Sequence, residues 1–219
     1  MKALGMIEVY SFTTAVFAAD VMAKTGNVKV IAFDRNRPFH KGFPVPLIMA
    51  VKIEGDVADV RAAVAAAESY AKGKGHFIVS HVIPRPGERV ELMAYRNDMN
   101  KDKFNKKMPK SFMGYECPRF TGDNALAILE VQGLVSSIEG LDAMLKTAEV
   151  RLVHTDKRLG GRLVTLIVAG KVDAVTSALE TGSARAKVYG EVYGTEVIAN
   201  PHPEVLKFFD LGENSILED

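Results

Sequence analysis

Hydrophobic and polar positions along this chain alternate in some segments with the period of a β-strand and in others with the period of an α-helix. The same order of strand-like and helix-like segments occurs twice. Short apolar or alternating runs predict strands, and runs with apolar positions three and four apart predict helices. In the first half, Ser11 is a candidate N-cap and two β-rich runs joined by a loop containing Pro and Gly predict a hairpin. The elements predicted there are strand 3–10, helix 12–24, strands 28–33 and 47–53, helix 57–73, strand 77–83 and a short helix over 88–94.

The second half repeats this order, and identical residues mark the repeat. Ala3, Leu4, Glu8 and Val9 recur as Ala125, Leu126, Glu130 and Val131. The elements predicted there are strand 125–131, helix 136–146, strands 150–154 and 163–169, helix 172–186 and strand 196–198. The order β-α-β-β-α-β predicts two tandem ferredoxin-like (split βαβ) domains of the α/β (α+β) class.

The repeat also sets the expected domain limits. We expect a first domain over residues 1–95, a polar and basic linker over 96–124, a second domain over 125–210 and a tail over 211–219. The first repeat carries about seven extra residues within 34–46, and an insertion confined to one place is typical of a lengthened loop.

Composition narrows the function classes. The 219 residues carry 28 basic and 27 acidic side chains, so the formal net charge is only +1 and does not favour binding to nucleic acid or to an anionic membrane. Charged residues interrupt the apolar N-terminus, so we expect neither secretion nor membrane insertion. The single cysteine, Cys117, has no partner within the chain. We find no pair of residues typical of acid–base or nucleophilic catalysis, and we predict that the protein is not an enzyme.

Three stretches of each repeat resemble the signature stretches of bacterial microcompartment shell domains. They are Ala3 to Glu8, Ala19 to Lys24 and Val82 to Pro86 in the first repeat, and Ala125 to Glu130, Leu141 to Lys146 and Val197 to Pro203 in the second. The unpermuted order is similar to that of the single-layer, tandem-domain shell proteins. This resemblance implies a homotrimer, in which three chains form a pseudo-hexagonal tile within a protein shell.

The resemblance also implies residues at the tile edge. The family's edge lysine corresponds to Lys24 and Lys146, and its edge arginine corresponds to Arg85. Asn27 lies close to Lys24, and Asn200 replaces the arginine in the second repeat, so that edge differs chemically. The alternative is that both lysines simply complement the C-terminal end of a helix.

The loop between the second and third strands would line the central pore of such a tile. The pore-lining candidates are Arg35, Asn36, Arg37, Pro38, Phe39, His40 and Lys41 in the first repeat, and Lys157, Arg158, Leu159, Gly160 and Gly161 in the second. A ring of cations favours anions, so one hypothesis is a pore for small anionic or polar metabolites. The other is that these side chains point into solvent.

The remaining expectations concern cofactors, partners and location. We expect no cofactor or metal, because neither loop contains a cysteine for an iron–sulfur cluster and Cys117 lies in the linker. The implied partners are the chain itself, other shell proteins and encapsulated enzymes, in a cytoplasmic microcompartment shell. A different function, a tandem ferredoxin-like regulator or metabolite-binding protein, fits the same fold.

Overall fold

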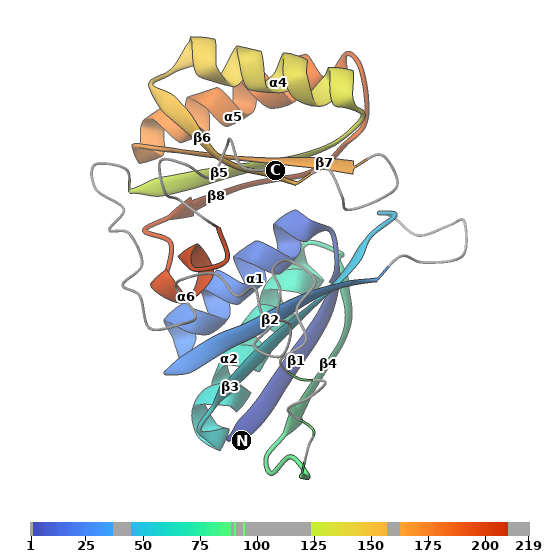
Figure 1. Ribbon diagram of the computed structural model, residues 1–219, viewed down its shortest axis with the longest axis vertical. Helices are drawn as coiled ribbons and strands as arrows, with labels where there is room; N and C mark the ends of the chain where they lie inside the picture. The colour runs from blue at the N-terminus through green and yellow to red at the C-terminus, as the bar shows by residue number, and fades with distance from the viewer. Residues whose placement is uncertain are drawn as a thin grey trace. The chain divides into compact units, whose positions relative to one another are not determined.

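Each repeat folds into one antiparallel sheet with two helices. The computed structural model describes residues 2–36, 45–88, 90, 94, 124–156 and 163–209 (Figure 1). The first repeat contains β1 (Ala3–Tyr10), α1 (Phe12–Thr25), β2 (Val28–Asn36), β3 (Ile48–Gly55), α2 (Val57–Gly73) and β4 (Phe77–Ile83). The second contains β5 (Ala125–Gln132), α4 (Leu134–Thr147), β6 (Val150–Asp156), β7 (Leu163–Gly170), α5 (Val172–Lys187) and β8 (Val192–Ala199), followed by α6 (Pro203–Leu206). The predicted β-α-β-β-α-β order and the fold class are confirmed, and most of the short helix predicted over 88–94 lies outside the described residues.

The two sheets share strand order and irregularities. The orders are β2-β3-β1-β4 and β6-β7-β5-β8, and every pairing is antiparallel. The register of the β2–β3 pair shifts between Val30 and Ala32, and that of the β6–β7 pair shifts between Leu152 and His154. A β-bulge changes the twist of a strand locally. Because the register shift occurs at corresponding places in both sheets, the two repeats are similar in backbone geometry as well as in sequence.

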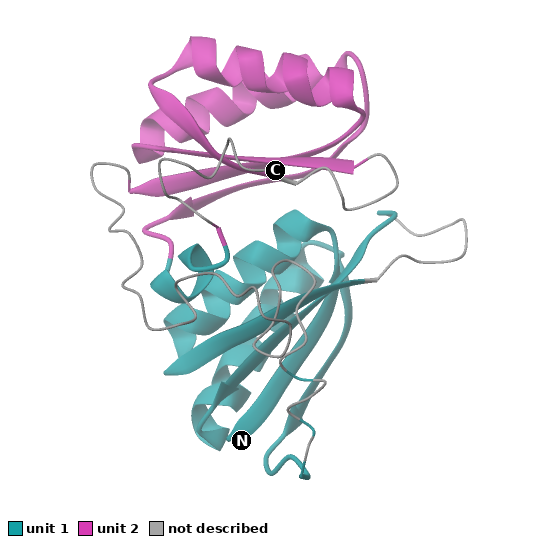
Figure 2. Cartoon of the chain, viewed as in Figure 1, with its two compact units in different colours: residues 1–117, 202–208 teal, residues 118–201, 209–219 magenta. Residues whose placement is uncertain are grey.

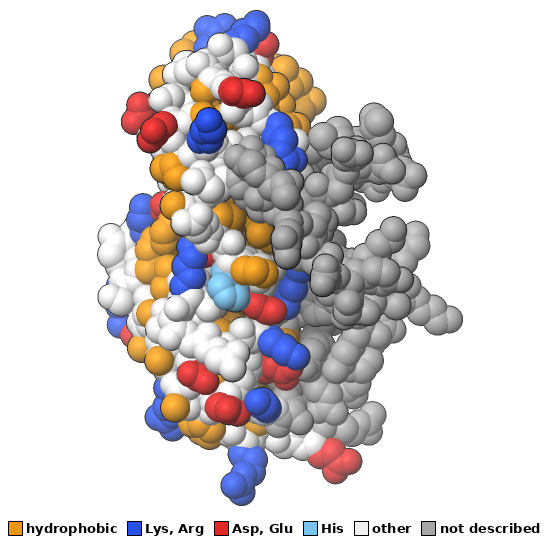
Figure 3. All heavy atoms as spheres, turned by 90° about the vertical axis from the view of Figure 1, so that its left-hand side faces the viewer, with side chains coloured by type: hydrophobic (Ala, Val, Ile, Leu, Met, Phe, Trp, Pro, Cys, Tyr) orange, Lys and Arg blue, Asp and Glu red, His pale blue; other side chains and the backbone are white. Residues whose placement is uncertain are grey.

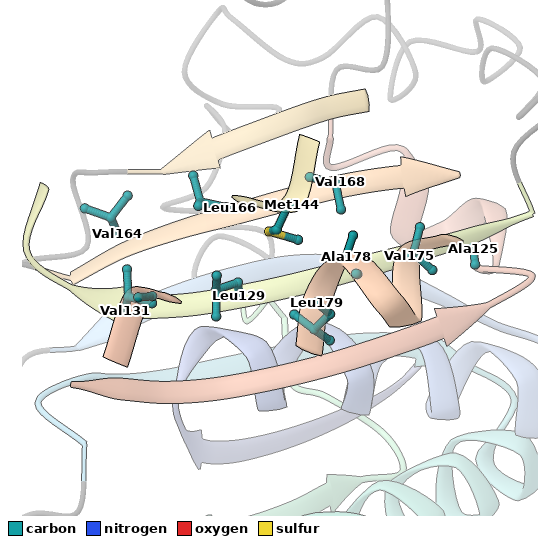
Figure 4. Packing of buried hydrophobic residues seen from close by; sticks show 12 residues of the cluster. Ala125, Leu129, Val131, Met144, Val164, Leu166, Val168, Val175, Ala178 and Leu179 are labelled. Carbon is teal, nitrogen blue, oxygen red and sulfur yellow. The ribbon is translucent and has the colours of Figure 1, made fainter. Parts of the chain in front are cut away.

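Both helices of a repeat cover one face of its sheet. In the second repeat, Met144 of α4 and Ala178 and Leu179 of α5 meet Leu129 of β5 in a buried apolar cluster (Figure 4). The two helices approach closely at Gly182, where an added Cβ would lie 2.3 Å from Met144 Cγ and 2.9 Å from the Gly140 carbonyl oxygen.

The turn between the first strand and the first helix requires an unusual backbone in both repeats. Ser11 has a φ of 75° and Gly133 has a φ of 101°. The expected side-chain cap by Ser11 is wrong, because its side chain makes no capping hydrogen bond with α1. A positive φ suits glycine, as in the second repeat.

The chain divides into two compact units, and each unit contains residues from more than one stretch of the sequence. Unit 1 comprises Met1–Cys117 with His202–Phe208, and unit 2 comprises Pro118–Pro201 with Phe209–Asp219 (Figure 2). The helix α6, which follows the last strand of the second repeat, therefore packs within unit 1, against α1 and β2.

Candidate functional site

The two candidate edge lysines occupy the last turns of α1 and α4. Lys24 Nζ lies 2.5 Å from Asp20 Oδ2, and Lys146 Nζ lies 2.7 Å from Asp142 Oδ2, each pair four residues apart. The pairs differ in burial, because the side chain of Asp20 is 3% exposed and that of Asp142 is 57% exposed. Cations here also complement the negative end of the helix dipole.

All five candidate edge residues are exposed, but the sheet order separates them. Lys24 and Asn27 flank the connection that leads into β2, which is one edge of the sheet of unit 1. Arg85 follows β4, which is the opposite edge. In unit 2, Lys146 precedes β6 and Asn200 follows β8, again at opposite edges.

Backbone conformation accounts for the exchange of Arg85 for Asn200. Asn200 has a φ of 46°, in the left-handed region, where asparagine is tolerated better than most residues. Its backbone N–H donates to the carbonyl of Asn124 at 2.6 Å. This turn is therefore tied to the start of β5, and the residue type follows the backbone at this position.

Most of the candidate pore residues lie outside the described part of the chain. Arg35 and Asn36 end β2. Those outside the described residues are Arg37, Pro38, Phe39, His40, Lys41, Lys157, Arg158, Leu159, Gly160 and Gly161. At the base of the first hairpin, Asp34 forms an ion pair with Lys52, whose side chain is 8% exposed. The nearby acidic residue is thus already neutralised within the sheet.

Two surface ion pairs, on α2 and between α4 and α5, shift the pKa of one of their members. Lys72 and Ser80 each donate to the Glu68 carboxylate at 2.5 Å and hold the pKa of Glu68 below its usual value. Glu139 accepts a hydrogen bond from Arg185 at 2.8 Å and raises the pKa of the Arg185 guanidinium. Such pairs fasten neighbouring elements together and do not require a catalytic role.

Within the described residues, no group of three or more His, Cys, Asp or Glu side chains is placed to hold a metal ion. Cys117 lies outside those residues. In the same part of the chain, none of the helices combines the length and the apolar character needed to cross a membrane.

An apolar surface on α4 was not anticipated from the sequence. Leu134, Val135 and Ile138 are each about 60% exposed, and Leu145 is 44% exposed. These four residues, with Asp142, define the α4 face. Beside its first turn lies a hollow lined by Gly133, Leu134, Val135, Ser136, Leu163, Val164 and Tyr189. Figure 3 shows hydrophobic side chains at several places on one face of the molecule, among them the upper right of the view, interspersed with charged ones. The helical period that predicts α4 does not distinguish an exposed apolar face from a core-facing one.

These features define a duplicated α/β protein with two corresponding candidate edges, which differ in chemistry, and an apolar helix face. The chain belongs to the BMC domain family, because the family model matches residues 3–86 and 125–201. It contains two BMC domains in tandem.

The similar proteins fall into two sets. The chain is 28% identical to "Carboxysome assembly protein CcmO" of Synechococcus elongatus over 93% of this chain and 67% of that protein. It is 46% identical to "Bacterial microcompartment shell protein PduA" of Citrobacter freundii over 40% of this chain and 94% of that protein. "Bacterial microcompartment shell protein EutM" of Escherichia coli K12 is 42% identical over 40% of this chain and 90% of that protein.

A solved structure, of a microcompartments protein from Desulfitobacterium hafniense, covers 92% of this chain and 96% of its own. It is 25% identical and has a TM-score of 0.36.

Proposed function

We propose that this chain is a structural shell protein of a bacterial microcompartment, and that three copies form a pseudo-hexagonal homotrimeric tile. The observation that carries the proposal is the tandem match, since about 40% of this chain aligns with nearly the whole of a single-domain shell protein. Three chains then supply as many domains as a six-membered ring needs, and closed rings are the usual symmetric solution for repeated modules.

The proposed domains are residues 1–95 and 125–210, with 96–124 as linker and 211–219 as tail. Other shell proteins meet the tile at its edges through Lys24, Asn27 and Arg85 in one domain and Lys146 and Asn200 in the other. The exposure of all five residues supports this role. The protein acts without catalysis or cofactor, within the microcompartment shell in the cytoplasm, around encapsulated enzymes.

The central pore is proposed to pass small anionic or polar metabolites. Arg35, Arg37 and Lys41 contribute positive charge from the first loop, and Lys157 and Arg158 contribute it from the second. A narrow cationic ring concentrates anions through its field.

Assembly tests the proposal. We expect the purified protein to be a trimer by light scattering and to form flat hexagonal sheets in negative-stain micrographs. A Lys24→Ala/Lys146→Ala variant should remain trimeric and lose the sheets, whereas Lys187→Ala, at another exposed helix end, should keep both. A discrete monomer with a saturable small ligand would instead indicate a tandem regulator.

The pore is tested separately in assembled shells. Neutral glutamines at Arg37, Lys157 and Arg158 should reduce anion flux and leave sheet formation unchanged. Unchanged anion flux would reject the charged pore and leave the tile standing.

A further inference from the structure

The ends of α1 and α4 are corresponding parts of the two repeats, and they differ in exposed charge. The α1 end comprises residues 20–29, and the α4 end comprises residues 142–151. The α1 end has two exposed lysines and no exposed carboxylate, because the side chain of its only acidic residue, Asp20, is 3% exposed. The α4 end has two exposed carboxylates, Asp142 and Glu149, beside two exposed basic residues. The two ends of one chain are therefore electrostatically different.

The proposed tile, on which this inference rests, places the two kinds of end alternately around its rim. Each of the three chains contributes one α1 end and one α4 end, so every second edge of the tile is of the same kind. The tile is then six-sided in outline and three-fold in the chemistry of its edges.

The geometry of a flat sheet restricts how such edges can meet. A three-fold tile in a hexagonal sheet has two distinguishable orientations, which differ by one sixth of a turn. Neighbouring tiles present like ends to each other only when their orientations differ. Three tiles that meet at a corner are all neighbours of one another, so they cannot all differ. A filled sheet therefore contains contacts between unlike ends, and a sheet with all tiles in one orientation contains only those.

Exposed charge favours the same pairing. When two α1 ends meet, lysines face lysines, and like charges placed opposite each other oppose association. When an α1 end meets an α4 end, Lys24 of one tile faces a surface that carries Asp142 and Glu149. Complementary charge of this kind contributes to the choice of partner and to the register of the contact.

We propose that tiles of this chain join through unlike ends, with the α1 end of one tile in contact with the α4 end of the next. Tiles in one orientation then repeat by translation alone. A ring of identical single domains has one kind of edge and is free of this restriction, which arises here from the divergence of the two repeats.

Directed cross-linking between tiles tests the pairing. Asn27 and Glu149 are counterparts in the repeat and both are exposed, so thiols at these two positions probe like and unlike contacts equally. In a Cys117→Ser background, Asn27→Cys trimers and size-tagged Glu149→Cys trimers are purified separately, mixed in equal amounts, allowed to form sheets and treated with a flexible bismaleimide. The mixed product should exceed either like product at least about tenfold on a denaturing gel.

The controls and outcomes separate this inference from the tile itself. Lys187→Cys in place of Glu149→Cys, at another exposed helix end, should give no mixed product. A wild type that forms no sheets would overturn the tile and with it this inference. Sheets in which like products equal or exceed the mixed product would overturn this inference and leave the tile standing.

Complementation between edge variants gives a second test without cross-linking. Lys146→Ala tiles keep an intact α1 end, and Lys24→Ala tiles keep an intact α4 end. Each variant alone should remain a discrete trimer by light scattering, at concentrations where their equimolar mixture associates through intact unlike ends. Equal association of each variant alone and of the mixture would contradict the proposal.

Discussion

At the scale of the residue, Asp20 shows how one side chain acquires a structural role that its repeat counterpart lacks. It is an unremarkable helix residue in the sequence, four positions before a lysine, as is Asp142. In the fold it is buried, pairs with Lys24 and accepts a hydrogen bond from the His202 backbone. Removing one partner of a buried, hydrogen-bonded carboxylate destabilises a fold far more than removing one partner of an exposed ion pair does.

We expect Asp20→Ala to lower the free energy of unfolding by about 2–4 kcal/mol, because it leaves the His202 N–H and Lys24 without their acceptor. Urea unfolding followed by circular dichroism measures this. Asp56→Ala is the control, because Asp56 is 74% exposed in its ion pair with Lys2 and makes no side-chain cap with α2. Equal losses in the two variants would show that Asp20 is no more than a surface charge.

At the scale of the element, periodicity predicted the six main elements of each repeat. Some of the predicted limits were wrong, at places where the apolar pattern is interrupted. Helix α4 begins at Leu134, two residues before the predicted start. Strand β8 begins at Val192, four residues before its predicted start, and Gly194 interrupts its β-rich pattern. Helix α6 was not predicted, although proline is common at the first turn of a helix and Pro203 stands there. In the structure the His202 side chain also caps this helix by accepting from the Glu204 N–H.

The packing of α4 on α5 depends on the absence of a side chain at Gly182. We expect Gly182→Ala to destabilise the protein by about 1–3 kcal/mol, because the Gly140 carbonyl oxygen is backbone and cannot move aside as Met144 can. Thermal unfolding measures the change.

Gly73→Ala is the matched control for this packing prediction. Gly73 ends α2 and has no atom within 4 Å of an added Cβ, so alanine there should be neutral or stabilise by up to about 1 kcal/mol. A neutral Gly182→Ala would mean that the two helices can separate at little cost.

At the scale of the whole molecule, the sequence predicted two domains and could not predict that residues 202–208 pack within unit 1. Repeat detection aligns each segment with its counterpart and assigns it to the domain that precedes it. The choice between units depends on side-chain contacts such as that of Phe208 with Phe33, which leave no periodic pattern. For the same reason, the sequence could not predict that Asp20 is buried while Asp142 is exposed, or that the apolar residues of the α4 face are exposed.

Residues at the far end of the second repeat should therefore control the stability of the first. Phe208 is 2% exposed and meets Phe33 of β2, so Phe208→Ala removes much of the apolar contact that holds α6 on unit 1. Native-state hydrogen exchange should show the amides of β2, including Val30, exchanging at least about tenfold faster, because loss of 1.4 kcal/mol of docking free energy corresponds to tenfold. Amides of β7, in unit 2, should keep their protection, and Val79→Ala, at a half-exposed site of β4, should leave β2 unchanged. Faster exchange confined to unit 2 would place α6 with the second domain.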